Sequence, residues 1–248
     1  MKRNLKLVLE YDGSRFHGWQ YQVGVRTVQG VLEEAIARLT GESRRVVAAG
    51  RTDTGVHALE QVVNFHTESS HPPEVFVRAL NAILPGDVAV LGCEEPEPKF
   101  NARSWAQGKI YRYLVYNRPR RRAFGHLYCW HIPEPLDVEA MKEAAKYLIG
   151  EHDFKSFQAS SRDNEGKNPV REMRRIDIKK TEPGYVCFEF EAKSFLRQMV
   201  RNIMGTLVMA GRGKIRPEAM KQILEAKNRK SAGPTAPGAG LYLVKVFY

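Results

Sequence analysis

Apolar residues fall at every second position at the start of the chain. The apolar side chains from Leu5 to Tyr11 alternate with Lys6, Val8 and Glu10, and Asp12-Gly13 follow as a turn. A period of two is the pattern of a strand with one buried face. The sequence therefore predicts a first strand that ends at residue 11.

The next apolar positions recur at helical spacing. Thr27 is a suitable N-cap and Gly41 a suitable stop, so the apolar residues between them predict a helix with one buried face. After it come two short apolar runs, a helical segment closed by Pro85-Gly86, and a further strand. These segments cover residues 46–49, 56–65, 73–84 and 88–91. The predicted order of elements is β-α-β-β-α-β.

The acidic, proline-bearing stretch from Glu94 to Pro98 has the composition of an exposed connector. We therefore expect two domains, residues 1–103 and 104–248, and the same order of elements recurs in the second. Its segments are a strand at 109–116, a helix at 138–148, a hairpin around Pro183-Gly184, a helix at 195–208 and a strand at 241–248. The predicted class is α+β, with two ferredoxin-like-derived β-α-β-β-α-β units whose antiparallel sheets meet at a central catalytic cleft.

Positive charge is concentrated in the second domain. Residues 1–100 contain 11 Lys and Arg against 13 Asp and Glu, whereas residues 101–248 contain 28 against 15. A basic excess favours polyanionic partners, because cationic side chains release counterions from phosphates. It also serves solubility alone, but the run Arg118-Pro119-Arg120-Arg121-Arg122 favours a nucleic acid.

Cysteine content and hydropathy restrict the class further. Cys93, Cys129 and Cys187 are isolated and odd in number, which argues against a disulfide framework or a zinc cage. No apolar run reaches the roughly 20 residues needed to span a bilayer, and the first residues lead directly into a strand. We expect a cytoplasmic protein with no metal and no membrane association.

A loop with an acid and an arginine is the strongest candidate for chemistry. Arg51 and Asp53 lie between Gly50 and Gly55, and apolar runs flank the segment. Such a loop is consistent with a turn in which Asp53 bonds its own backbone. A guanidinium beside a carboxylate, between glycines that permit close backbone approach, also suits phosphate contact and base handling.

The sequence also has to be weighed against three functions other than chemistry on a nucleic acid by this loop. Asp53-Thr54-Gly55 matches the aspartic-protease signature, but it occurs once and that chemistry needs two carboxylates, so only a dimeric protease fits. His66-Thr67-Glu68 fits the H-x-E of zinc deaminases, whose P-C-x-x-C partner is absent. An RNA-binding module without catalysis is the third.

The loop from Tyr11 to Gln22 is rich in aromatic and amide side chains. Trp19 favours a packed turn, since tryptophan is mostly buried, but the same residues suit stacking and edge contacts to RNA.

Several segments together resemble the tRNA pseudouridine synthase A family. They are the G-R-T-D-x-G-V-H-A element around Asp53, the Y-D-G-x-x-F-x-G-W-Q-x-Q element from Tyr11, and the element Phe195–Arg201. Lys109–Tyr113, His152–Phe154 and Thr235–Pro237 leading to Leu243 agree, and the likeness covers essentially the whole chain. Gly238-Ala239 departs slightly from the family pattern, but both side chains remain small.

The resemblance implies an isomerase that converts uridine to pseudouridine at positions 38, 39 and 40 of the tRNA anticodon stem-loop, without a cofactor. It implies that Asp53 is the nucleophile and that Arg201 favours its ionised form. Tyr111 stacks on the target uracil and Leu243 lines the pocket, although sheet packing explains both equally well. Arg51 braces the space left by the flipped base.

Further arginines are expected on the RNA backbone. Arg197 and Arg201 are four residues apart, so both are expected on one side of a helix. Arg121 and Arg174, with their basic neighbours, are expected to hold phosphates and to read shape more than sequence. The family is known as a homodimer in which one tRNA touches both subunits, so the apolar stripe at 195–208 suits either a core or an interface.

Overall fold

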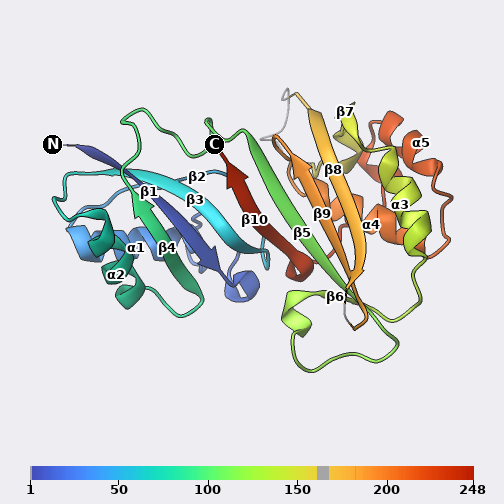
Figure 1. The fold of residues 1–248 in the computed structure, drawn as a ribbon, viewed down its shortest axis with the longest axis horizontal. Coiled ribbons are helices and arrows are strands. Elements are labelled where there is room, and N and C mark those ends of the chain that lie inside the picture. The colour runs from blue at the N-terminus through green and yellow to red at the C-terminus, as the bar shows by residue number, and fades with distance from the viewer. Residues whose placement is uncertain (1, 161–167, 182) are drawn as a thin grey trace. The chain divides into compact units, whose positions relative to one another are not determined.

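The computed structural model describes residues 2–160, 168–181 and 183–248. The chain forms two compact units. The first consists of Met1–Gln107 and Tyr242–Tyr248, and the second of Gly108–Leu241. Each combines a sheet with packed helices, which confirms the predicted α+β class (Figure 1).

A mostly antiparallel sheet forms the first unit. Its strands run in the order β4-β1-β3, and the short strand β2 pairs with β3. The last strand of the chain, β10, also pairs with β3, in the parallel sense. Apolar partners such as Leu5 and Phe65 face each other in the register of β1 and β3. The bounds are β1 Arg3–Tyr11, β2 Val47–Ala48, β3 His57–Thr67, β4 Val88–Glu94 and β10 Leu241–Phe247.

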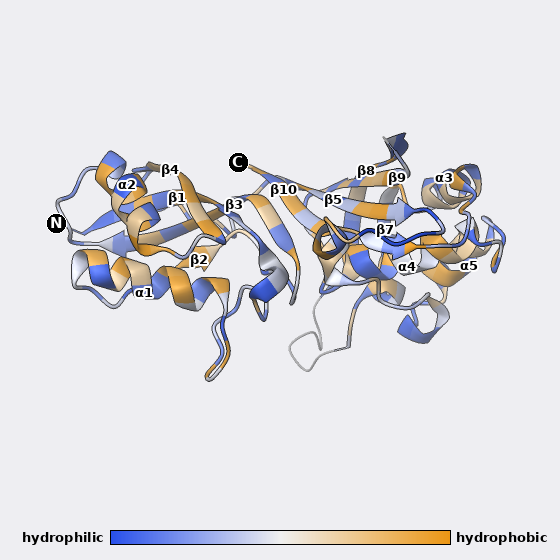
Figure 2. Ribbon diagram, turned by 90° about the horizontal axis from the view of Figure 1, so that it is seen from below, coloured by the Kyte–Doolittle hydropathy of each residue, from blue (hydrophilic) through white to orange (hydrophobic). Residues whose placement is uncertain are grey.

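Both predicted helices of this unit are present. The helix α1 spans Val28–Thr40, with the Thr27 side chain as its N-cap and Gly41 as its left-handed C-cap. The helix α2 spans Pro73–Ile83. Orange and blue residues alternate along α1 in Figure 2, as expected of a helix with one buried face.

The second unit is built on the strand order β5-β9-β8-β7, with all three pairs antiparallel, and β6 pairs with β5 in parallel. The predicted hairpin is therefore confirmed as β8 and β9. The short strands β6 and β7 were not predicted from the sequence. The bounds are β5 Gly108–Asn117, β6 Trp130–Ile132, β7 Gly150–Asp153, β8 Val170–Thr181 and β9 Tyr185–Ala192.

Among the described residues, buried side chains lie on one face of this sheet. Tyr111, Tyr113 and Val115 of β5 are buried and pair with Phe190, Phe188 and Val186 of β9, which are also buried. The alternate positions, from Arg112 to Tyr116 on β5, lie on the other, more exposed face. Period-two alternation thus separates a core face from a polar face.

Three α-helices lie in the described part of the second unit. The helix α3 spans Val138–Lys146, α4 spans Met199–Gly211 and α5 spans Ala219–Glu225. The largely buried α4 lies behind β8 and β9 in Figure 1. None of the helices in the described part of the chain is long and apolar enough to cross a membrane.

Two sequence expectations differ from the structure. The acidic stretch that begins at Glu94 is tied to β1, because Arg3 pairs with Glu95 at 2.7 Å and Lys6 with Glu94 at 2.7 Å. The first unit accordingly continues to Gln107. The final strand, expected in the second domain, belongs to the first unit from Tyr242 onward, because backbone pairing places it beside β3.

Candidate active site

Asp53 lies in the loop between β2 and β3, and its side chain is half-buried. Thr52, next to it, is buried, and its hydroxyl forms a 2.8 Å hydrogen bond with the Tyr11 hydroxyl. The amide of Val56 donates to the Asp53 carbonyl at 3.1 Å and closes a turn. The buried Thr52 and the turn closed by the buried Val56 therefore hold the backbone of the acid in place, whereas Arg51 and Thr54 are exposed.

The first loop of the chain packs directly against this turn. The amide of Trp19 donates to the Thr52 carbonyl at 3.0 Å. A Cβ at Gly18 would lie 2.7 Å from that carbonyl oxygen, and Gly18 has φ of +82°. A Cβ at Gly13 would overlap the carbonyl of Val56. The two sequence elements around Tyr11 and Asp53 thus fit together only because glycine lets the backbones approach.

Phe16 and Trp19 are packed in this loop and are 1% and 2% exposed. The interpretation of the loop as a packed turn is therefore confirmed for both rings. Neither presents a face on which RNA can stack.

His57, which directly follows this loop, was not singled out by sequence reasoning. It is 2% exposed, and its Nδ1 accepts the Gly13 amide at 3.1 Å. Its ring stacks on Tyr242 of β10 at 4.8 Å. The Asp12 carboxylate is 3.2 Å from the same nitrogen. His57 therefore positions the backbone of the first loop.

Tyr11 and Gln61 form hydrogen bonds that hold the Asp53 loop. Gln61 is fully buried, and its amide donates to the Gly50 carbonyl at 2.7 Å and to the Tyr11 hydroxyl at 3.4 Å. Burial raises the pKa of the Tyr11 phenol to about 12. Tyr11 is thus neutral at physiological pH and bonds Thr52 as a hydroxyl.

Leu243 is fully buried on β10, where it is the register partner of Ala58 on β3. That pairing brings it beside the strand that follows the Asp53 loop. Asp53, Arg51 and Leu243 therefore all belong to the first unit.

Tyr111 is 8% exposed on the buried face of β5, in the second unit. Its ring meets Phe195 edge to face, with centroids 5.0 Å apart and an interplanar angle of 82°. This pair joins two of the family-like segments, Lys109–Tyr113 and Phe195–Arg201, within one unit.

Arg201 lies on α4, and its Nε donates to the Ala236 carbonyl at 2.7 Å. Its own carbonyl accepts the Ala236 amide at 3.1 Å. The segment Thr235–Pro237 is thus fixed to the helix that carries Arg201. Pro237 in turn accepts a 2.8 Å hydrogen bond from the Tyr113 hydroxyl.

A buried polar network, not anticipated from sequence, supports this arrangement. The Asn202 side chain accepts from Thr235 at 2.7 Å and from Arg229 at 2.9 Å, and donates to the Phe157 carbonyl at 2.8 Å. Arg229 also donates to the Gly233 carbonyl at 3.0 Å. A polar residue within the apolar stripe of α4 was the signal that could have revealed it, since buried amides need partners.

The predicted helical pairing of Arg197 with Arg201 is wrong. Helix α4 begins at Met199, and Gln198 before it has a left-handed backbone with φ of 57°. The chain therefore turns between the two arginines. Arg197 is exposed, and its carbonyl accepts the Ala159 amide at 3.0 Å.

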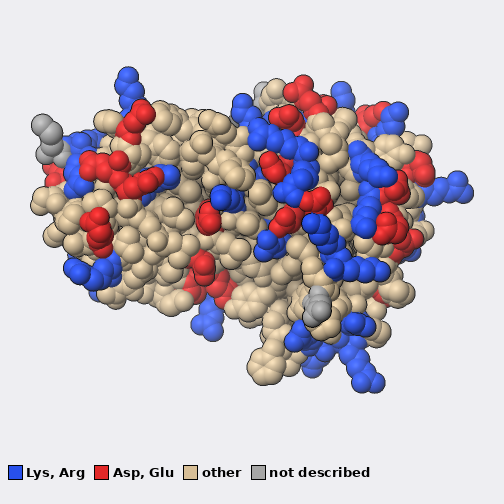
Figure 3. Space-filling model, viewed as in Figure 1, with Lys and Arg blue, Asp and Glu red and all other residues tan. Residues whose placement is uncertain are grey.

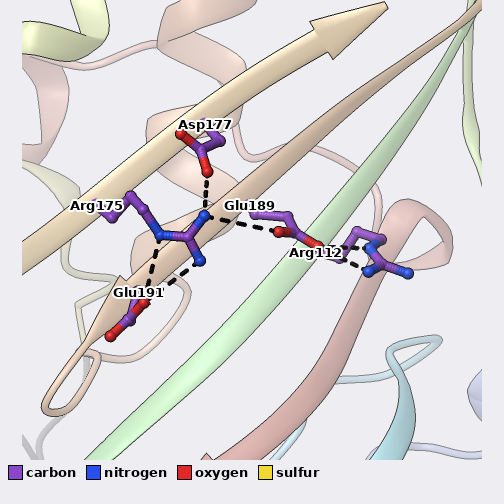
Figure 4. Close-up of polar contacts among 5 residues, drawn as sticks. All are labelled: Arg112, Arg175, Asp177, Glu189 and Glu191. Atoms are coloured by element: carbon purple, nitrogen blue, oxygen red, sulfur yellow. Dashed lines mark hydrogen bonds and ion pairs between the residues drawn. The ribbon is translucent and has the colours of Figure 1, made fainter. Parts of the chain in front are cut away.

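The basic residues of the second unit fall into two kinds. Figure 3 shows Lys and Arg gathered over its strands. Arg175 is engaged by three carboxylates, since it contacts Asp177, Glu189 and Glu191, and Glu189 also pairs with Arg112 at 2.7 Å (Figure 4). Arg121 and Arg174 are exposed, with a 3.6 Å contact from Arg174 to Glu172. These two are better placed than Arg175 for an external anion.

The family model for tRNA pseudouridine synthase matches residues 7–103 and 144–248. The chain belongs to the tRNA pseudouridine synthase family. It is 46% identical over 246 residues to "tRNA pseudouridine synthase A" of Thermoanaerobacter sp. (strain X514), covering 99% of this chain and 100% of that relative. The protein of the same name from Myxococcus xanthus is 45% identical over 98% of this chain and 91% of its own.

Among solved structures, the archaeal box H/ACA sRNP Nop10-Cbf5 complex contains a chain 13% identical to this one, with a TM-score of 0.35. The match covers 83% of this chain and 42% of the other. Family membership makes the chain a pseudouridine synthase, which is an isomerase. The predicted family and enzyme class are confirmed.

Proposed function

We propose that this chain isomerises uridine to pseudouridine at positions 38, 39 and 40 of the tRNA anticodon stem-loop, with Asp53 as the nucleophile and no cofactor. The observation that carries the proposal is the construction of the Asp53 loop. Thr52 and Val56 are buried on either side of the acid, and the first loop bonds the turn at the Thr52 carbonyl. Catalytic groups need this kind of fixed support.

The reaction moves one bond and needs no electron acceptor. The bond from the ribose to N1 of uracil breaks, the base turns, and a bond forms from the same ribose carbon to C5. N1 gains a proton and C5 loses one, so the product has the composition of the substrate. A carboxylate nucleophile divides this exchange into two easier steps by holding either the ribose or the base covalently.

The other residues act on the same uridine in this proposal. Tyr111 stacks on the uracil, and Leu243 packs against it. Arg201 acts with Asp53 in catalysis, and its 2.7 Å bond to Ala236 keeps the guanidinium in one orientation. Flipping the base out of its stack costs a few kcal/mol. Arg51, which is exposed beside Asp53, fills the space that the base leaves.

Assembly and RNA contact complete the proposal. Arg121, Arg174 and Arg197, all exposed, contact the RNA backbone. The active form is a cytoplasmic homodimer, and the element orders of the two units reflect ferredoxin-like ancestry. The β4-β1-β3 order of the first unit, with β2 beside β3, supports this origin.

The deciding experiment compares the natural protein with Asp53→Asn on an unmodified tRNA anticodon stem-loop, with and without a chelator. We expect pseudouridine from the natural protein only, at the same rate with the chelator. Asp137→Asn is the matched control, because it removes the same charge and asparagine caps α3 about as well as aspartate. An RNA-binding module would bind the stem-loop and give no product, which would refute the proposal.

A further inference from the structure

A loop with many arginines and exposed aromatic rings joins β5 to β6. We call residues 118–128 the arginine loop. Four of its residues are exposed arginines, and Phe124 is 86% exposed. The sequence from Asn117 to Pro133 contains no Asp or Glu. Figure 3 shows the resulting cluster of basic side chains below β6 in the view.

Two tyrosines form a platform at the base of this loop. Tyr116 of β5 and Tyr185 of β9 are register partners on the polar face of the sheet, with ring centroids 5.1 Å apart. The Arg122 guanidinium lies 5.7 Å from one ring and 5.9 Å from the other, and donates to the Tyr185 hydroxyl at 3.3 Å. A cation is therefore held beside two aromatic rings.

Each tyrosine of the platform lines a cavity. One of about 430 Å³ is lined by Tyr185, Arg118 and Lys180 among others. The other, about 200 Å³, is lined by Tyr116, Arg121, Arg122, His126, Cys129 and His131. Each therefore combines a tyrosine with two cations. The smaller cavity is below the range of about 300–1,000 Å³ typical of small-molecule sites, and the larger one is in the lower part of that range, which suits one base or one phosphate.

The loop is anchored at its base. The Asn117 side chain donates to the carbonyls of Ile132 and Glu134 at 2.9 and 2.7 Å. His131 Nε2 donates to the Arg118 carbonyl at 2.8 Å. The walls of the cavities are thus held before a ligand arrives, which lowers the entropic cost of binding.

We propose that the arginine loop and the tyrosine platform bind an unstacked nucleotide of the RNA substrate. The base stacks on an aromatic ring of Tyr116 or Phe124, and the flanking phosphates contact the cations of the two cavities. That the ligand is RNA rests on the proposed function. Unpaired bases stack on aromatic faces while cations contact the neighbouring phosphates. Such a site favours single-stranded RNA, because a duplex does not present its bases for stacking.

The test uses a short fluorescent oligouridylate and measures its affinity by anisotropy at several salt concentrations. Phe124→Ser should weaken binding by about 5-fold or more. Phe124→Tyr should bind as the natural protein does, because stacking needs only an aromatic ring. Arg122→Gln should weaken binding and lower the salt slope by about 0.7. Arg38→Gln, an exposed arginine on α1, is the matched control and should bind as the natural protein does.

Two further measurements keep the outcome decisive. Ultraviolet cross-linking of a bromouridine-containing oligouridylate should label Phe124 or Tyr116, and this does not depend on a variant that folds. Equal affinity of the natural protein, Phe124→Ser and Arg122→Gln would overturn the proposal. Competition by duplex RNA as strong as that by the single strand would also overturn it, since phosphates alone would then explain binding.

Failure of this site is distinguishable from failure of the proposed function. If the natural protein forms pseudouridine but Phe124→Ser binds oligouridylate normally, only the nucleotide site is wrong. If no pseudouridine forms but Phe124→Ser and Arg122→Gln lose binding, the site stands and the catalytic proposal fails.

Discussion

Gly18 lies at one of the backbone contacts between the two family-like segments of the first unit. Gly18→Ala introduces a Cβ 2.7 Å from the Thr52 carbonyl oxygen and should displace the Asp53 loop. We expect a loss of pseudouridine formation of at least ten-fold, on the order of the rate change that small misplacements cause. Product formation and thermal unfolding are the measurements.

Gly24→Ala is the matched control for this prediction. Gly24 has φ of +78°, close to that of Gly18, but a Cβ there meets nothing within 4 Å. Both variants carry the left-handed backbone cost of about 1 kcal/mol, and only Gly18→Ala adds the clash. Equal activity of the two would show that the contact with Thr52 does not position Asp53.

Burial of Tyr11 lowers the stability of the protein at alkaline pH. Burial raises its pKa from 10.0 to about 12, so the folded protein keeps a proton that the unfolded chain loses. The stabilisation is complete below pH 10 and is lost as the pH rises towards 12. Between pH 10 and pH 12, we expect the free energy of unfolding of the natural protein to fall by up to about 2–3 kcal/mol more than that of Tyr11→Phe.

Urea unfolding at pH 8, 10 and 11 measures this difference. At pH 8, Tyr11→Phe should be less stable by about 1 kcal/mol, because the 2.8 Å bond to Thr52 is lost. Tyr21→Phe removes a hydroxyl from a 44% exposed ring and should follow the natural protein at every pH. Parallel curves for Tyr11→Phe and the natural protein would contradict the assignment.

At the scale of elements, α4 shows what periodicity predicts and what it misses. The apolar stripe correctly indicated a buried helix, but the helix begins at Met199, four residues later than expected. Leu196 and Phe195 are apolar for reasons of loop packing, which periodicity does not distinguish from helical burial.

The Asn202 network gives a prediction for this element. Asn202→Ala removes the partner of the Phe157 carbonyl and one partner of the Arg229 guanidinium. The free energy of unfolding should therefore fall by about 2–4 kcal/mol. Activity should fall as well, because Thr235 loses its 2.7 Å bond to Asn202, which is one of the bonds between the segment Thr235–Pro237 and the helix of Arg201. Gln222→Ala, on an exposed position of α5, should change stability by less than about 0.5 kcal/mol. Urea unfolding of both variants tests this, and equal stability would show that the network adds nothing.

At the scale of the whole molecule, the charge of +11 is best tested through its salt dependence. Arg121→Gln and Arg174→Gln should each weaken tRNA binding and lower the salt slope by about 0.7–0.9. The loss should appear in KM rather than kcat, since these side chains hold phosphates in our proposal. Arg38→Gln is again the control. A large fall in kcat would place either arginine at the chemistry.

Patterns in the sequence were enough to predict the α+β class, most strands and helices, and the family. Local periodicity specifies an element, and the segments around Tyr11 and Asp53 identify the family whatever their arrangement in space. Only the tertiary structure showed that these segments pack together through Gly13 and Gly18. It also placed the last strand beside β3 and surrounded Arg175 with carboxylates. These features depend on contacts between residues far apart in the chain, and local patterns of polarity contain no information on which distant residues become neighbours.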